Sequence, residues 1–351
     1  MEAKAKSVVV LRGSEANDQT HAPSQASLVY LVASSAVVGS RRIPSEEVDR
    51  AFGMPNGKLR SRAGIESLAY AAEDENELTL GARAAQRALH IAECGVPELD
   101  WIIATSETHR GYPSLAAQLH CQLLARENCG ALDVGGACLG FVNALAVAQG
   151  LIASRQARTI AVITSDVHSR TFKPGLVAGE FGGLFGDGAS AFLLRAKNRA
   201  RRKPTYELGE FFFGCAGQFA GAIRVADAPN GNLDVHFDGE ALSRAAITRL
   251  EKVVRETELR SGIDRSSLQG LATHQPNPRL VTLLAKQCGL PQDKFPVVAE
   301  SFGNLGSSTC GVALDTLLRS AQGQSDKQVG PIFTASLGPG LLFGGGWLVP
   351  A

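Results

Sequence analysis

The chain has 351 residues, enough for one large domain or two domains of about 150 residues each. Its 35 Lys and Arg residues nearly balance 34 Asp and Glu residues, and the formal charge of +1 argues against binding nucleic acid through a strongly basic domain. With 44% hydrophobic and 20% charged residues, the composition predicts a folded core rather than extensive disorder.

The predicted elements begin after an N-terminal extension over residues 1–26. In residues 27–195, β-branched runs predict strands at 28–38, 100–105, 131–134, 159–164 and 189–194, and helical spacing predicts helices at 79–94, 114–124 and 140–154. A segment with six basic residues, RAKNRARRKP, begins at Arg195. We interpret it as a solvated connection, with a partner-binding patch as the alternative.

The pattern repeats over residues 196–351. Strands are expected at 206–213, 271–273, 297–298, 331–336 and 346–349, and helices at 240–259, 278–288 and 307–321. Short strands joined by helices predict a mixed α/β protein, and the shared order of elements predicts two similar halves divided near residue 195.

The seven cysteines are irregularly spaced, and no CxxC pair or zinc-ligand spacing occurs. This usage predicts a reduced, cytoplasmic protein without a disulfide framework or a metal site. The apolar stretch over residues 28–39 is interrupted by serines and is too short to cross a bilayer, and residues 1–26 lack the pattern of a signal peptide.

Cys138 lies in DVGGACLGF, where a predicted strand turns tightly into a predicted helix of small residues. The positive end of that helix favours the thiolate, which is the nucleophilic form of cysteine. The small neighbours leave room for a substrate carbonyl. The alternative, for Cys138 taken alone, is a buried cysteine that only packs.

His274 and Asn304 lie in the second half, at the ends of predicted elements. His274 follows a short strand in ATHQPNPRL and is placed to face a cleft, although a structural histidine would fit there equally. Asn304 lies in the glycine-framed turn FGNLGSS, where it either donates a hydrogen bond into a cleft or caps the turn. A thiol nucleophile with two neutral donors can perform acyl-transfer chemistry.

These motifs, in this order, resemble those of the β-ketoacyl-ACP synthase III enzymes of the thiolase superfamily. The resemblance rests on GGACLGF, THQPNPRL, FGNLGSS and SLGPGLLFGGG, with support from RAGI, YPS, SDVHSRT and FGDGASA, and covers the chain from about residue 27 to its end. It implies a thiolase-like fold, in which two duplicated α/β halves form five αβαβα layers. Residues 27–195 would hold the nucleophile, and residues 196–351 the histidine and asparagine.

The resemblance also implies a role for each matched residue. An acyl thioester would acylate Cys138, while His274 and Asn304 would stabilise the enolate that forms as a malonyl thioester loses carbon dioxide. The backbone N–H groups of Cys138 and Gly340 would form the oxyanion hole. The remaining matches are Arg62, Arg170 and Asn277 for coenzyme A or the pantetheine tunnel, Arg279 for an acyl carrier protein, and Tyr112 for the acyl pocket of the second subunit of a homodimer. No resident cofactor is implied.

Several positions depart from the family pattern. Lys58 lies where an adenine-stacking tryptophan is usual, Glu66 replaces a second basic residue, and Leu139 follows the nucleophile in place of serine. We expect an enzyme of specialised metabolism, in a pathway to polyketide or fatty-acid-derived products, that performs decarboxylative condensation. The alternatives are acyl transfer from Cys138 to a hydroxyl or amine, and a non-catalytic partner subunit. We expect no binding to nucleic acid or to a membrane.

Overall fold

A computed structural model describes residues 27–177, 179–196, 205–228, 233–321 and 329–351. The predicted extension over residues 1–26 and most of the basic segment that begins at Arg195 lie outside the described residues. None of the helices in the described ranges combines the length and the hydropathy that crossing a bilayer requires.

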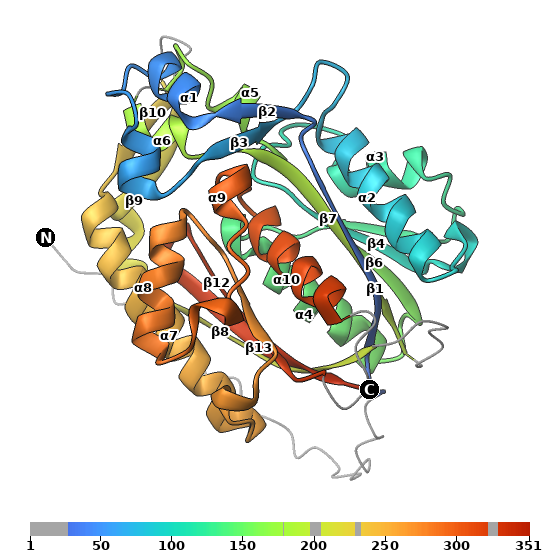
Figure 1. Cartoon of the computed structure of the whole chain (residues 1–351). Helices are drawn as coiled ribbons and strands as arrows, with labels where there is room; N and C mark the ends of the chain where they lie inside the picture. The colour runs from blue at the N-terminus through green and yellow to red at the C-terminus, as the bar shows by residue number, and fades with distance from the viewer. Residues whose placement is uncertain (1–26, 178, 197–204, 229–232, 322–328) are drawn as a thin grey trace, which may run out of the picture.

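Nine strands of the described chain form one mixed sheet, whose order joins an N-terminal group to a C-terminal group (Figure 1). The N-terminal group runs β1 (Tyr30–Val38), β7 (Asp187–Arg195), β6 (Thr159–Val167), β4 (Trp101–Thr105) and β5 (Gly130–Asp133). The C-terminal group runs β8 (Tyr206–Cys215), β13 (Leu342–Pro350), β12 (Ile332–Gly338) and β11 (Gly270–Thr273). The groups meet where Tyr30 and Leu31 of β1 pair with Glu207 and Tyr206 of β8.

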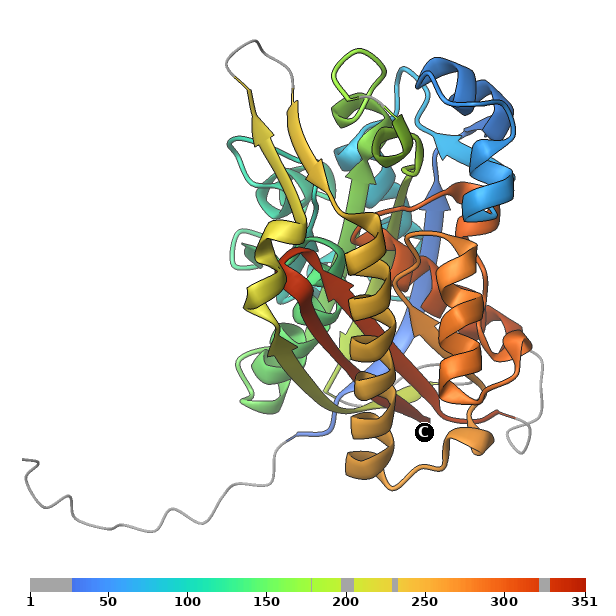
Figure 2. The same cartoon turned by 90° about the vertical axis from the view of Figure 1, so that its left-hand side faces the viewer.

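Helices cover both groups of strands and also fill the space between them, which gives the expected αβαβα layers (Figures 1 and 2). The outer helices on the N-terminal strands are α2 (Glu77–Ile91) and α3 (Leu115–Gln122). The middle layer holds α4 (Gly140–Ala153) and α10 (Ser308–Ala321), and the outer helices on the C-terminal strands are α7 (Gly239–Ser261) and α8 (Pro278–Cys288). An apolar core fills each of the spaces between these layers.

Smaller elements that the sequence pattern did not predict lie near one end of the sheet (Figure 1). They are the strand pairs β2 (Arg41–Pro44) with β3 (Ser67–Tyr70) and β9 (Ile223–Asp227) with β10 (Leu233–Phe237), and the short helices α1 (Ser45–Ala51), α5 (His168–Thr171), α6 (Gly179–Gly183) and α9 (Ala299–Phe302). A fourth apolar cluster, rich in phenylalanine, packs among them.

The prediction of a strand at 297–298 is wrong. There the N–H groups of Val298 and Ala299 donate to the side-chain oxygen Oε1 of Gln275, at 2.9 and 3.2 Å, instead of to a neighbouring strand, and α9 begins at Ala299. A buried glutamine amide therefore takes the place of a strand partner.

Parallel pairing decides which loops meet. β4 is parallel to both β5 and β6, so the loops that follow these three strands leave the same edge of the sheet. β11 and β12 are likewise parallel in the C-terminal group. In open α/β sheets, ligand sites gather beyond the carboxyl ends of parallel strands, and the chemistry-bearing residues of this chain follow such ends.

Candidate active site

Cys138 lies in a single 3₁₀ turn, Ala137–Leu139, between β5 and the first residue of α4. Its backbone carbonyl accepts a hydrogen bond from Ser336 Oγ of β12 at 2.8 Å, so a strand of the C-terminal group holds the turn in place. The sulfur itself lines a pocket. The expected position of Cys138, at a tight strand-to-helix turn, therefore agrees with the structure.

The expected ionisation of Cys138 is wrong. Burial, and then the nearby carboxyl groups of Glu107 and Asp166, raise the pKa of its thiol well above the usual value. The helix start does not reverse this effect, because burial and the two acidic groups together outweigh the positive end of a helix dipole. At neutral pH the resting nucleophile is a thiol, which must lose its proton as it reacts.

His274 directly follows β11, and its backbone N–H extends the strand ladder by donating to Ala335 at 3.3 Å. The ring is buried, and its Nδ1 has no hydrogen-bond partner among the described residues. Burial lowers the pKa of His274 to about 4. The imidazole is therefore neutral at physiological pH and can donate a hydrogen bond without first being protonated.

Asn304 precedes α10, and its side-chain oxygen Oδ1 accepts hydrogen bonds from the backbone N–H of Gly306 at 2.9 Å and from Thr309 Oγ1 at 3.3 Å. Its backbone is fixed on both sides, by bonds to the carbonyl of Leu184 and from the N–H of Gly186. With Oδ1 occupied by two donors, the amide nitrogen is the group left to face the pocket. The turn role and the donor role are thus combined in one residue.

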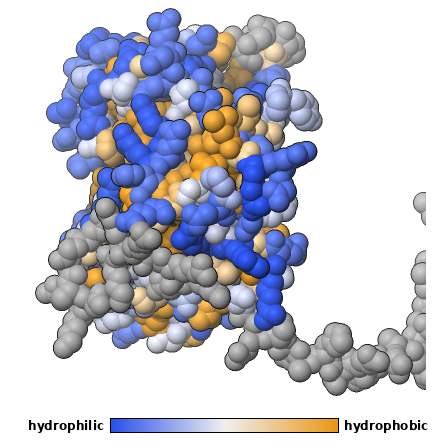
Figure 3. Space-filling model, turned by 90° about the vertical axis from the view of Figure 1, so that its right-hand side faces the viewer, coloured by the Kyte–Doolittle hydropathy of each residue, from blue (hydrophilic) through white to orange (hydrophobic). Residues whose placement is uncertain are grey.

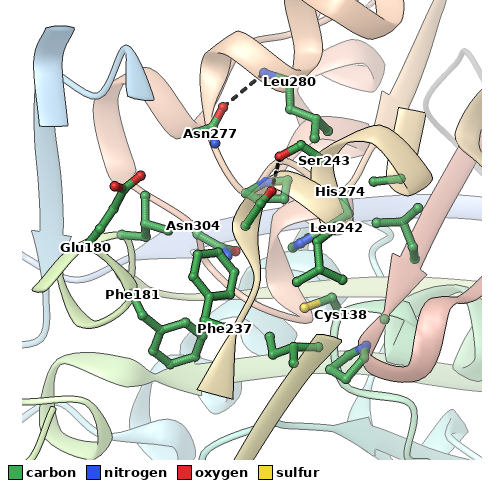
Figure 4. A pocket seen from close by; sticks show the side chains of 18 of the residues that line it. Cys138, Glu180, Phe181, Phe237, Leu242, Ser243, His274, Asn277, Leu280 and Asn304 are labelled. Atoms are coloured by element: carbon green, nitrogen blue, oxygen red, sulfur yellow. Dashed lines mark hydrogen bonds between the residues drawn. The ribbon is translucent and has the colours of Figure 1, made fainter. Parts of the chain in front are cut away.

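Cys138, His274 and Asn304 meet at one pocket of about 490 Å³, and Figure 4 shows their side chains around a common space. Most of the remaining lining is apolar and comes from several elements: Phe181, Leu184, Phe185, Ile223, Phe237, Leu242, Ala246, Leu280, Leu337 and Leu341. The pocket thus brings the Cys138 thiol and the His274 and Asn304 side chains together with largely apolar walls, and its other polar lining residues are Glu180, Glu240, Ser243 and Asn277.

The loop that follows β12 lies against the nucleophile turn. A Cβ atom on Gly338 would lie 2.6 Å from the carbonyl oxygen of Gly136, so only glycine allows this approach. Gly340, two residues further along, has a φ of 79° and lies beside, rather than among, the residues that line the pocket. This placement brings the Gly340 loop next to Cys138, as the expected oxyanion hole requires, but leaves that role a prediction.

Of the residues expected to bind the rest of the substrate, Asn277 lines the pocket and also caps α8 by accepting from the N–H of Leu280 at 2.9 Å. Arg62 and Arg170 are exposed and do not line the pocket. The Arg170 guanidinium donates to the backbone carbonyl of Ala72 at 2.6 Å. Arg279 lies beside the Arg62 segment, because its guanidinium hydrogen-bonds the carbonyl of Ser61.

Lys58 and Tyr112, both noted in the sequence, lie outside the pocket lining. Lys58, which replaces a usual tryptophan, forms an ion pair at 3.2 Å with Glu180, a residue of the pocket lining. Tyr112 does not line the pocket of its own chain and has a relative exposure of 101%. The Tyr112 ring is therefore not packed against the described part of its own chain.

Three ionisable residues near the nucleophile were not predicted from the sequence to belong to the site. Glu107 follows β4, Asp166 lies near the end of β6, and His168 begins α5. Nε2 of His168 lies 3.5 Å from Oε2 of Glu107, and Oδ1 of Asp166 accepts from the Glu107 N–H at 2.6 Å. Each residue follows or ends a buried apolar strand, and this is the one sequence signal that could have drawn attention to them.

The three groups hold one another in particular protonation states. Burial alone would lower the pKa of His168, but Glu107 and Asp166 raise it to about 9. Burial alone would raise the pKa of Glu107, but His168 outweighs this effect and holds it below the usual value. Burial raises the pKa of Asp166 to about 6. At neutral pH an imidazolium therefore lies beside the Glu107 carboxylate.

Comparison with known proteins gives a consistent family. Residues 132–217 match the family model of 3-oxoacyl-[acyl-carrier-protein (ACP)] synthase III, and residues 259–349 match the model of its C-terminal part. The β-ketoacyl-[acyl-carrier-protein] synthase III of Haemophilus ducreyi is 31% identical over 294 residues, which cover 82% of this chain and 86% of the relative. That of Serratia proteamaculans is 32% identical over 277 residues, which cover 77% and 84%.

Solved structures share the fold. The priming β-ketosynthase of the R1128 polyketide biosynthetic pathway superposes with a TM-score of 0.82 at 25% identity, covering 93% of this chain and 97% of that one. The 3-oxoacyl-[acyl-carrier-protein] synthase III of Aquifex aeolicus gives a TM-score of 0.80 at 23% identity, covering 92% and 100%. At 23% identity, the similarity to the Aquifex aeolicus structure supports the shared fold and nothing more.

Proposed function

Because this chain belongs to the β-ketoacyl-[acyl-carrier-protein] synthase III family, we propose that it condenses an acyl thioester with a malonyl thioester, with loss of carbon dioxide, through an acyl-enzyme at Cys138. The observation that carries the proposal is the meeting of Cys138, His274 and Asn304 at one largely apolar pocket. The product is a β-ketoacyl thioester.

In the first half of the reaction, the Cys138 sulfur attacks the acyl thioester carbonyl, and the donor leaves as a thiol. The backbone N–H groups of Cys138 and Gly340 stabilise the charge on the carbonyl oxygen. In the second half, the malonyl thioester loses carbon dioxide and the resulting enolate attacks the acyl group on Cys138. The neutral His274 ring and the Asn304 amide nitrogen stabilise the enolate oxygen, because preorganised neutral donors do so without removing a proton.

The substrates are thioesters, and the enzyme needs no resident cofactor. The apolar lining suits an acyl chain or a pantetheine arm. Arg279 and Arg62 are exposed on neighbouring segments, which supports contact with an acidic acyl carrier protein or with the phosphates of coenzyme A. If Arg279 meets the carrier protein, Arg279→Glu reduces the reaction with carrier-protein substrates more than with coenzyme A esters. Equal losses contradict this assignment.

The working unit is a homodimer in which β5 strands of two copies lie at the interface. β5 is the last strand of the sheet order and its residues Ala131, Leu132 and Asp133 are exposed, so its free edge is open to another strand. An apolar patch lies on the face at the right of Figure 1, where α2 and α3 lie (Figure 3). The fully exposed Tyr112 is then available to the acyl pocket of the second copy. Light scattering of wild type and Leu132→Arg tests the dimer: a wild-type monomer contradicts it.

The experiment that tests the proposed reaction is a panel of acyl-CoA donors read by intact mass. The expected result is one acyl adduct that is lost in Cys138→Ala and kept in Cys121→Ala, a matched control at an exposed cysteine. Carboxyl-labelled malonyl-CoA, or malonyl carrier protein, is then added to the acyl-enzyme. Release of labelled carbon dioxide together with a β-keto product supports condensation.

The same measurements separate the two alternatives. Transfer of the acyl group to an alcohol or amine without release of carbon dioxide would make the protein a simple acyltransferase. Failure of every donor to acylate Cys138 would favour a non-catalytic partner subunit. The presence of both His274 and Asn304 in the pocket favours condensation, because a simple transferase needs a base for its acceptor rather than a second enolate donor.

A further inference from the structure

We infer that Glu107 is a further catalytic residue, which takes the proton of the Cys138 thiol as the sulfur attacks the acyl donor and returns that proton to the leaving thiolate. The inference deepens the proposed function, since it rests on acylation of Cys138. It concerns a carboxyl group that decarboxylative condensation itself does not require, because loss of carbon dioxide generates the carbanion.

The fold holds the Glu107 carboxyl group in place from several sides. Its backbone N–H donates to Asp166, and its Oε2 faces the Nε2 of His168 at 3.5 Å. Gly306 approaches so closely that a Cβ atom there would lie 3.1 Å from the carboxyl carbon of Glu107 and 2.3 Å from the His168 ring. These contacts hold the carboxyl group against the loop that carries Asn304.

One carboxyl oxygen remains without a partner. Oε1 of Glu107 is buried and accepts no hydrogen bond from the described residues. A buried oxygen in this state is costly unless a donor reaches it during function. The Cys138 thiol is such a donor. Burial raises the pKa of Glu107, His168 lowers it by more, and a hydrogen bond from the Cys138 side chain lowers it further.

The charges favour Glu107 over His274 as the proton acceptor. Protonation of Glu107 removes one charge from the buried cluster of Glu107, Asp166 and His168. Protonation of His274 would add a second buried cation, and the charge of His168 already helps burial to lower the pKa of His274. Because buried charges are expensive, the first route is the easier one.

The step balances as follows. The Sγ–H bond of Cys138 breaks as the new Sγ–carbon bond forms, and the proton passes to Oε1 of Glu107. The tetrahedral intermediate then collapses, the carbon–sulfur bond of the donor breaks, and the proton passes from Glu107 to the leaving sulfur. Glu107 ends as a carboxylate and Cys138 as a thioester. His168 is a positioning residue, because it holds Oε2 and leaves Oε1 free.

The test measures the rate of acylation of Cys138 by a competent acyl-CoA, by rapid quench and intact mass, from pH 6 to pH 9. We expect a nearly constant rate for wild type between about pH 7 and pH 8, where Glu107 and Asp166 are ionised and His168 is protonated. In Glu107→Gln the rate at pH 7 should fall by about 10²–10⁴-fold. It should then rise about tenfold per pH unit as thiolate forms.

A purely electrostatic or structural role predicts the opposite sign. In the wild type, burial is the first cause of the raised pKa of the Cys138 thiol and Glu107 is the second. Removing the Glu107 charge therefore lowers that pKa. Without base catalysis, Glu107→Gln would therefore acylate faster than wild type at pH 7. A faster or unchanged rate in this variant overturns the inference, as does a wild-type rate that itself rises tenfold per pH unit.

Two controls keep the outcome interpretable. Alkylation of Cys138 by iodoacetamide uses preformed thiolate, and should be at least as fast in Glu107→Gln as in wild type if the site is folded. Asp315→Asn neutralises another buried carboxyl group, which bonds to Ser34 away from the pocket, and should leave acylation within a few-fold of wild type. If wild type forms no adduct with any donor, the proposed function fails. If wild type is acylated and Glu107→Gln matches it, only the inference fails.

Discussion

Replacing Asn304 by aspartate separates the two halves of the proposed reaction. One carboxyl oxygen of the new side chain takes the place of Oδ1 and can still accept from Gly306 and Thr309, so the turn before α10 keeps the bonds that now fix it. What changes is the group facing the pocket, which becomes an acceptor in place of the amide donor. An ionised carboxylate there repels an enolate instead of stabilising it.

The size of the effect follows from the loss of one preorganised donor. We expect condensation by Asn304→Asp at pH 8 to fall by about 10²–10³-fold, which corresponds to about 3–4 kcal/mol of transition-state stabilisation. Acylation of Cys138 should change only a few-fold, because Asn304 has no role in that half. Since burial favours the neutral carboxylic acid, which can donate, part of the condensation activity should return as the pH falls.

The assay measures both halves on the same preparation. Intact mass follows acylation, and release of labelled carbon dioxide from the malonyl substrate follows condensation. Asn128→Asp makes the same chemical change at the surface, where the side chain accepts a hydrogen bond from Arg126, and should leave both rates unaltered. Equal losses in acylation and condensation, or full condensation at pH 8, would refute the assignment of Asn304 as an enolate donor.

The remaining predictions concern stability, the nucleophile turn and the pocket. Although burial opposes it, Glu107 and Asp166 raise the pKa of His168 from 6.5 to about 9. The imidazolium therefore contributes up to about 3 kcal/mol to folding below pH 6.5, which is lost as the pH rises through about 9. Thermal melts should show this loss in wild type and a flatter dependence in His168→Phe. Gly338→Ala forces a Cβ atom against the nucleophile turn, and acylation should slow by at least tenfold without loss of the far-UV spectrum. Phe237→Ala removes a ring from the lining, and the donor panel should shift toward longer or bulkier acyl groups, whereas an unchanged preference would contradict its role.

The sequence predicts best where the signal is local. The helix at 278–288 has the expected bounds, because Asn277 caps its start and Gly289 ends it in the left-handed conformation. The strand expected at 297–298 fails because its backbone N–H groups bond to the Gln275 side chain, which no local pattern reveals. The β9 and β10 pair was missed, because its pairing depends on packing against distant elements.

The site shows the same division. Cys138, His274 and Asn304 each lie in a recognisable glycine-rich or proline-rich turn, so their motifs could be identified from the sequence. Glu107 and His168 are 61 residues apart, and they meet only because β4 and β6 are neighbours in the sheet. The order of strands in a sheet cannot be predicted from the local spacing of apolar residues. For the same reason, the effect of Glu107 on the ionisation of Cys138 could not be foreseen.

The junction of β1 with β8 has a mechanical consequence. One continuous sheet, with α4 and α10 packed against strands of both groups, means that the nucleophile and its two donors sit on a single rigid frame. Separating the two groups of strands would expose the apolar core between them to water, which has a large free-energy cost. Substrates therefore enter and leave without separation of the two groups of strands, and the spacing of Cys138, His274 and Asn304 stays constant.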